Sequence, residues 1–132
     1  MSTTTQTGKP TLLMAEDEED TASLLRFLLE RSGFQVLHAP DGRQAQQMID
    51  TMKPPRLILL DVMLPHLSGL QLLTLIRKKP EWQEIPIIML TADSSEHDIQ
   101  LALSSGANDY MIKPFNPREL TARLNRLLKQ AA

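Results

Sequence analysis

The chain has no cysteine among its 132 residues. This absence excludes disulfide bonds, thiolate catalysis and cysteine-bound zinc, and it is typical of proteins from the reducing cytoplasm, where we expect this one. An excess of one charge is also lacking, since 14 basic and 16 acidic residues leave a formal net charge of −2. The charge balance therefore gives no indication of direct contact with nucleic acid. The longest apolar runs fall far short of the roughly 20 residues of a membrane span, so we expect no membrane association.

What the chain does contain is the composition of an ordinary globular domain, with 42% hydrophobic and 23% charged residues. Residues 1–10 are rich in Thr, Ser and Gln and lack the apolar core of a signal peptide, so we expect a flexible N-terminal tail. No linker divides the rest, which predicts one domain over residues 11–130. The three histidines, His38, His66 and His97, are isolated in the sequence, and we expect ordinary surface positions for them.

Short apolar runs alternate with helical patterns along this domain. The apolar run 57–60, bounded by Pro and Gly clusters, is typical of a strand buried on both faces of a parallel sheet. Strand and helix alternate at intervals of roughly 20 to 25 residues, which favours parallel strands joined by right-handed helical crossovers. We therefore predict a doubly wound α/β fold with strands at about 11–15, 34–39, 57–61, 87–90 and 109–112, and helices at about 21–32, 42–52, 69–79, 95–105 and 117–130.

Most of these predicted strands end on residues that carry chemistry. Glu16 and Asp17 follow the first strand, Asp61 ends the third, Thr91 follows the fourth, and Lys113 follows the fifth. Taken one at a time, each has an ordinary explanation as part of a solvated loop, a helix cap or a turn. Because the carboxyl ends of parallel strands lie along one edge of the sheet, we expect all of them to converge on one shallow site there.

A group of carboxylates in such a site needs a compensating charge. Three carboxylates within a few ångströms repel one another, and a divalent cation such as Mg²⁺ relieves the repulsion through the oxygen ligands that it prefers. Lys113 adds a positive charge for a phosphoryl oxygen, and the Thr91 hydroxyl adds a hydrogen-bond donor. Together these groups favour phosphoryl transfer, with Asp61 as the nucleophile that accepts the group.

Several stretches of the sequence resemble the motifs of one family: Met14–Asp17, Leu60–Pro65, Met89–Ala92 and Gly106–Phe115. On this set, residues 11–130 are similar to the receiver domains of two-component response regulators. The resemblance implies a flavodoxin-like sheet of five parallel strands in the order 2-1-3-4-5. It also implies a signalling phosphoprotein that catalyses only its own phosphorylation and dephosphorylation, and not an enzyme acting on other substrates.

The family's site roles carry over onto the matching residues. The resemblance implies that Asp61 accepts a phosphoryl group from the phosphohistidine of a sensor histidine kinase or a histidine phosphotransfer protein. It implies that Asp17, Asp61 and the backbone carbonyl of Met63 bind Mg²⁺, with Glu16 acting through water. Glu16 is a conservative departure, because many relatives have aspartate at this position.

The resemblance implies a conformational switch as well. Thr91 is expected to move toward the new phosphate and Tyr110 to turn inward from the surface, since a two-state switch needs a ligand that favours one state. Met63 and Asp93 stand two residues beyond Asp61 and Thr91, where relatives tune the loss of phosphate. We expect the bulky Met63 to hinder an attacking water and to give a phosphoryl lifetime of minutes or longer.

The output surface is expected on the predicted fourth helix, fifth strand and fifth helix, through which relatives bind a downstream protein. The fourth helix carries apolar residues on opposite sides, more than one buried stripe can use. Asp109, Glu119 and Arg123 match a charged network through which some relatives dimerise on phosphorylation, whereas Ile99 and Asn108 depart from it. The sequence therefore supports a phosphorylation-linked dimer only in part.

Alternatives to this interpretation differ in their chemistry. The chain is either a stand-alone receiver or the receiver part of a longer regulator with a DNA-binding or enzymatic domain, and the sequence does not separate the two. A haloacid dehalogenase-like phosphatase also has an aspartate nucleophile, but it needs a second acid at the position of Met63. A flavin-binding protein of the same fold needs a phosphate-binding loop after the first strand, where Glu16 and Asp17 repel phosphate.

Overall fold

The computed structural model describes residues 8–92 and 96–131. Residues 1–7 of the predicted tail lie outside the described residues, as does Asp93. The chain forms a sheet of parallel strands in the order β2-β1-β3-β4-β5. The strands are β1 (Thr11–Ala15), β2 (Gln35–Ala39), β3 (Leu57–Asp61), β4 (Ile87–Thr91) and β5 (Asp109–Ile112). The predicted parallel sheet and its strand order are confirmed.

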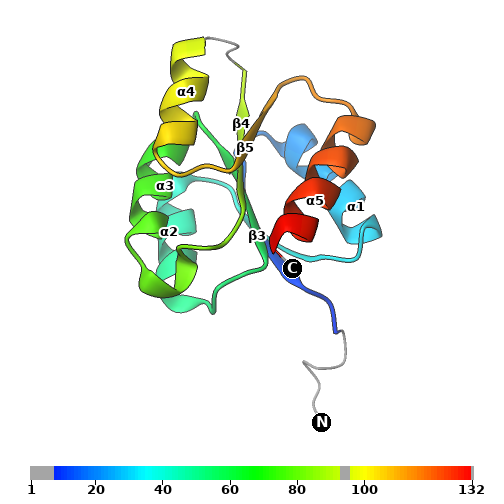
Figure 1. Cartoon of the computed structure of the whole chain (residues 1–132), viewed down its shortest axis with the longest axis horizontal. Helices are drawn as coiled ribbons and strands as arrows, with labels where there is room; N and C mark the ends of the chain where they lie inside the picture. The colour runs from blue at the N-terminus through cyan, green and yellow to red at the C-terminus, as the bar shows by residue number, and fades with distance from the viewer. Residues whose placement is uncertain (1–7, 93–95, 132) are drawn as a thin grey trace.

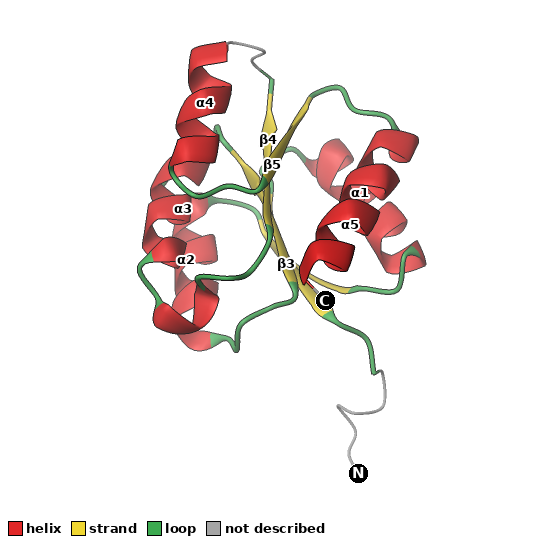
Figure 2. Cartoon of the chain, in the orientation of Figure 1, coloured by secondary structure: helices red, strands yellow, loops and turns green. Residues whose placement is uncertain are grey.

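Helices cover both faces of this sheet, as Figure 1 and Figure 2 show. One face carries α2 (Gly42–Thr51), α3 (Gly69–Arg77) and α4 (Glu96–Ser104), and the other carries α1 (Glu19–Arg31) and α5 (Pro117–Ala131). The doubly wound arrangement is therefore confirmed. Within the described ranges, no helix is both long and apolar enough to cross a lipid bilayer.

Local chemistry sets where the helices begin and end. Ser68 and Gln71 form a capping box at the start of α3. α1 begins at Glu19, about two residues earlier than predicted, because acidic residues are favoured near the positive end of the helix dipole. α3 ends at Arg77, two residues earlier than predicted, and an unpredicted 3-10 helix, η2 (Pro80–Trp82), follows it. Pro80 disfavours helical backbone in the residue before it, so the chain leaves α3 early.

The core lies on both sides of the central strands. Every residue of β3 and β4 is buried, and successive side chains alternate between a cluster facing α2–α4 and a cluster facing α1 and α5. In β1, Leu12 and Leu13 are fully buried in opposite clusters. Burying one leucine contributes roughly 1.5 to 3 kcal/mol relative to leaving it exposed, so a slip of register would be costly. The carboxyl ends of these strands are therefore held in fixed positions side by side.

Gly69, the first residue of α3, permits close contact between that helix and β3. A Cβ atom at this position would lie 2.2 Å from the backbone carbonyl oxygen of Asp61. The Gly69 N–H donates to the carbonyl of Val62 at 3.0 Å. Any larger residue would require a backbone shift, so glycine allows α3 to pack directly against the end of β3.

Candidate functional site

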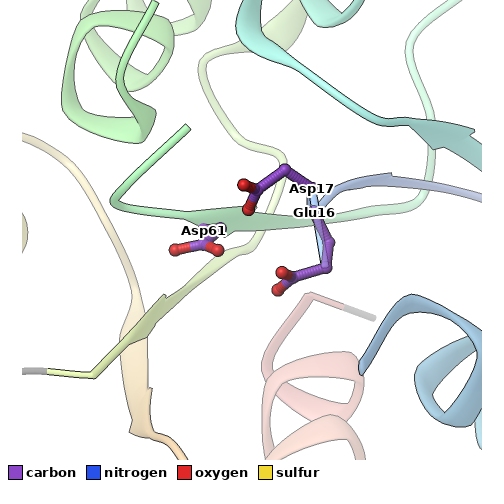
Figure 3. A group of neighbouring side chains, drawn as sticks. All are labelled: Glu16, Asp17 and Asp61. Atoms are coloured by element: carbon purple, nitrogen blue, oxygen red, sulfur yellow. The ribbon is translucent and has the colours of Figure 1, made fainter. Parts of the chain in front are cut away.

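Three carboxylates meet at the carboxyl edge of the sheet. Glu16 and Asp17 follow β1, and Asp61 is the last residue of β3. Ala15 pairs with Leu60 in the parallel ladder, so the residues that follow them emerge side by side. One oxygen from each of the three carboxylates lies within 4.8 Å of the others, and Figure 3 shows the three side chains grouped at this edge. The structure thus brings together three of the predicted site residues.

Lys113 joins this cluster from the end of β5. Its Nζ lies 2.8 Å from Glu16 Oε1 and 2.8 Å from Asp61 Oδ2. Its backbone N–H donates to the carbonyl of Thr91 at 2.7 Å, which ties the ends of β4 and β5 together. The other oxygen of Asp61, Oδ1, accepts a hydrogen bond from the Met63 N–H at 3.0 Å. Both oxygens of Asp61 are therefore oriented by donors.

Burial decides the electrostatics of the cluster. Glu16 is fully buried and Asp61 is 4% exposed. Desolvation by burial raises the pKa of Glu16, and the hydrogen bond from Lys113 offsets this effect only in part. Burial by itself lowers the pKa of Lys113, but the hydrogen bonds to Asp61 and Glu16 outweigh it, so the pKa of Lys113 is raised. The two carboxylates therefore stabilise the ammonium form of Lys113, while burial opposes the ionisation of Glu16.

The cluster fits a small divalent cation. Glu16 Oε1 is buried and forms an ion pair with the Lys113 ammonium, but it receives no further donor from the described residues. One ammonium cannot compensate the negative charge of several carboxylates, and carboxylate oxygens are ligands that Mg²⁺ prefers. These residues can therefore hold a metal ion. Direct binding by Asp17, Asp61 and the Met63 carbonyl, and binding through water by Glu16, stay predictions.

Thr91 and Tyr110 line one small cavity beside this cluster. Thr91, the last residue of β4, is 6% exposed, and Tyr110 in β5 is half-buried. The cavity measures about 10 Å³, barely the space of one water molecule, and Ile99 and Ala102 of α4 also line it. The Arg123 guanidinium lies over the Tyr110 ring, 5.6 Å from its centroid. The two predicted switch residues share this cavity, and their movement stays a prediction.

One residue next to the cluster was not found from the sequence. His66 and His97 are exposed, as expected. The prediction is wrong for His38, which is half-buried in β2 and has its Nε2 atom 2.7 Å from the backbone carbonyl oxygen of Glu16. Because the partner is a backbone atom 22 residues away, no pattern of side chains in the sequence could indicate this contact.

A second residue missed from the sequence lies at the end of α3. The Arg77 guanidinium donates to the carbonyls of Gly106 at 3.0 and 2.8 Å, Trp82 at 2.9 Å and Gln83 at 3.2 Å, and to Asn108 Oδ1 at 3.0 Å. Desolvation by burial lowers the pKa of Arg77, and the nearby charge of Glu84 offsets this effect only in part. Arg77 therefore joins the end of α3 to the turn that follows α4.

Comparison with known proteins agrees with this geometry. A family model described as the response regulator receiver domain matches residues 12–125. The chain is 45% identical over 120 residues to the alkaline phosphatase synthesis transcriptional regulatory protein PhoP of Bacillus subtilis, covering 91% of this chain and 49% of that protein. It is 43% identical over 120 residues to the transcriptional regulatory protein CpxR of Escherichia coli, covering 91% of this chain and 50% of that protein. The chain thus spans about half the length of these curated relatives.

Solved structures give the same result. The receiver domain of a Francisella response regulator has a TM-score of 0.84 and 34% identity, with 94% of this chain and 100% of that chain covered. The receiver domain of a sensor histidine kinase from Pseudomonas aeruginosa, with a magnesium ion coordinated in its active site cleft, has a TM-score of 0.83 and 31% identity, with 92% and 98% covered. By its sequence motifs, its strand order and its cluster of carboxylates, the chain belongs to the family of response regulator receiver domains.

Proposed function

We propose that this chain is a phosphorylation-dependent signalling switch. In this proposal Asp61 accepts a phosphoryl group, in the presence of Mg²⁺, from the phosphohistidine of a sensor histidine kinase or a histidine phosphotransfer protein. The observation that carries the proposal is the position of Asp61, whose carboxylate meets Glu16, Asp17 and the Lys113 ammonium at one edge of the sheet. Membership of the receiver family supports the same assignment.

The surrounding groups suit Asp61 for nucleophilic attack. One carboxylate oxygen would bond to phosphorus as the P–N bond of the donor breaks, and the electron pair of that bond would return to the imidazole. Lys113, held 2.8 Å from Asp61 Oδ2, would neutralise charge on the transferred group, and the Thr91 hydroxyl would donate a hydrogen bond to it. A magnesium ion held by the carboxylates would supply further positive charge to the phosphoryl oxygens.

The cavity between β5 and α4 offers a route for the signal. Once Thr91 moves toward the phosphate, the space beside it becomes available to the Tyr110 ring. The Arg123 guanidinium, which lies over this ring, would then lose that contact. The phosphoryl group would supply the contacts that differ between the two states, as a two-state switch requires.

We place the output surface on α4, β5 and α5, where it would control a downstream protein. Leu101 and Leu103 of α4 are 43% and 40% exposed, a surplus of apolar surface that supports a protein partner there. A phosphorylation-linked dimer through this face is less well supported. Buried Asp109 already pairs with Arg123 and Arg126 of its own chain, and these pairs would have to exchange in such a dimer.

The receiver part of a longer regulator is the alternative for the whole protein. The curated relatives are transcriptional regulators about twice as long as this chain, which supports a DNA-binding domain elsewhere in such a protein. Phosphatase activity has less support, because the side chain two residues beyond Asp61 is Met63, which is 75% exposed and cannot protonate a leaving group.

Intact mass spectrometry after incubation with acetyl phosphate and Mg²⁺ tests the proposal. We expect the wild type to gain one phosphoryl group, and neither the Asp61→Asn variant nor a sample in EDTA to gain it. A wild type that stays unmodified, or a variant that is modified equally, would contradict the assignment of Asp61. Steady turnover of p-nitrophenyl phosphate would favour the phosphatase instead.

A further inference from the structure

In the loop that carries Glu16 and Asp17, both backbone polar groups of Glu16 form hydrogen bonds with β2. The Glu16 N–H donates to the carbonyl of Ala39 at 3.1 Å, directly after the last β1–β2 pair, Ala15 with Ala39. The Glu16 carbonyl oxygen lies 2.7 Å from His38 Nε2. A carbonyl only accepts hydrogen bonds, so His38 Nε2 must carry a proton and donate it.

This second hydrogen bond bears directly on Asp17. The carbonyl of Glu16 belongs to the planar peptide unit that leads into Asp17, so its orientation sets the position of the Asp17 Cα atom and limits the directions in which the side chain can leave it. The Asp17 side chain is exposed and has no hydrogen bond or ion pair to any other described part of the chain. Its place beside Asp61 therefore depends on the backbone rather than on side-chain contacts.

We infer that His38 is a positioning residue for the metal site, acting through the backbone of Glu16. This inference rests on the proposed function only for the metal, because the hydrogen bond itself is present without one. By holding the peptide before Asp17, His38 lets the three carboxylates meet before a cation arrives, and a site that is already organised binds more tightly. A purely structural role for His38 would affect the stability of β2 but not the geometry of Asp17.

Two substitutions separate these roles. Glutamine can place an amide N–H close to the position of His38 Nε2, whereas leucine fills similar space without a donor. His38 also lines a hollow of about 370 Å³ beside α1, so there is room for either side chain to adjust. His97→Leu, which replaces an exposed histidine, is the matched control.

Calorimetric titration with Mg²⁺ alone gives the first readout. We expect His38→Leu to weaken Mg²⁺ binding roughly tenfold, as loss of an outer-shell partner does elsewhere, and His38→Gln to restore most of the affinity. His97→Leu should bind as the wild type does. Equal affinity in the wild type and His38→Leu, or an equal loss in the leucine and glutamine variants, would overturn the inference.

Amide hydrogen exchange in EDTA gives a readout that needs no metal. We expect the N–H groups of Asp17 and Glu18 to exchange faster in His38→Leu than in the wild type, and those of β3 to be unchanged. If the wild type binds no Mg²⁺, the proposed function fails, but this exchange result still decides whether His38 holds the loop. Unchanged exchange at Asp17 and Glu18 would refute it, as would equal acceleration throughout the sheet.

Discussion

Replacing Lys113 with methionine isolates the charge that holds the carboxylate cluster together. Methionine keeps most of the apolar stem of lysine but removes the ammonium that lies 2.8 Å from both Glu16 and Asp61. Two buried carboxylates would then face each other without a cation. We expect the metal-free variant to be less stable than the wild type at neutral pH. We also expect it to bind Mg²⁺ more tightly, because the site has lost one positive charge.

The size of the loss follows from burial. Removing one partner of a buried ion pair typically costs about 3 to 5 kcal/mol. The Lys113 side chain is 19% exposed, whereas those of Glu16 and Asp61 are 0% and 6% exposed, so we expect the lower end, about 3 kcal/mol in the free energy of unfolding. Mg²⁺ at 100 times its dissociation constant would raise the free energy of unfolding by about 2.7 kcal/mol for a protein that binds it only when folded.

The pH dependence distinguishes lost charge from lost packing. A raised pKa of Lys113 means that its stabilisation is fully present below its ordinary pKa and is lost only as the pH rises through the folded-state value, so it is constant between pH 5 and 8. Burial raises the pKa of Glu16, and the variant lacks the Lys113 ammonium that lowers it, so Glu16 stabilises the fold when protonated and this contribution is lost as the pH rises. The loss of free energy of unfolding in Lys113→Met should therefore be smaller at pH 5 than at pH 8.

Urea unfolding in EDTA at both pH values, repeated with Mg²⁺ at pH 8, measures these differences. Lys78→Met is the control, because Lys78 is exposed and outside the cluster, and it should change stability by less than about 0.5 kcal/mol. A deficit of Lys113→Met that is the same at both pH values and is not reduced by Mg²⁺ would refute the electrostatic argument.

Other substitutions test separate parts of the structure. Met63→Asn replaces an apolar side chain that is 75% exposed with one that can orient water, and should shorten the phosphoryl lifetime on the order of tenfold in a radiolabel decay assay; an unchanged lifetime would exclude Met63 as a barrier to water. Arg77→Leu leaves several carbonyls without a donor and should lower the free energy of unfolding by about 3 kcal/mol in urea, whereas a loss below 1 kcal/mol would show that water replaces the guanidinium. Gly69→Ala places a Cβ atom 2.2 Å from the Asp61 carbonyl oxygen and should lower stability by roughly 1 to 3 kcal/mol and slow phosphorylation by acetyl phosphate; wild-type rates would show that α3 yields without disturbing Asp61.

The parts of the fold that were predictable are those in which side-chain type and position in the sheet are linked. The continuous apolar runs of β3 and β4 gave strands buried on both faces, and parallel topology then brought Glu16, Asp17 and Asp61 to one edge. Lys113 was expected near a phosphoryl group, and the structure shows in addition that it is shared between Glu16 and Asp61. That sharing depends on distances in three dimensions, which no spacing in the sequence encodes.

Most of the contacts that were not predicted from the sequence are made to backbone atoms. His38 reaches a carbonyl at the end of β1, and Arg77 reaches carbonyls in two separate segments, at Trp82 and Gln83 and at Gly106. Every residue has a backbone carbonyl, so the residue types around the acceptor do not indicate which side chain will donate to it. The early start of α1 and the presence of η2 were missed for a similar reason, since several neighbouring residues could serve as the boundary.

The hydrogen bonds of Arg77 hold the end of α4 in place. The turn after its last residue is clamped, because the Gly106 carbonyl accepts two hydrogen bonds from the guanidinium. The first turn lies about 12 Å away along the axis, at a rise of 1.5 Å per residue. A tilt of about 10° around the clamped end would therefore carry the first turn roughly 2 Å sideways. In the proposed switch, a small repacking beside Thr91 that tilts α4 about this clamped end would therefore produce its largest displacement at the first turn of the helix.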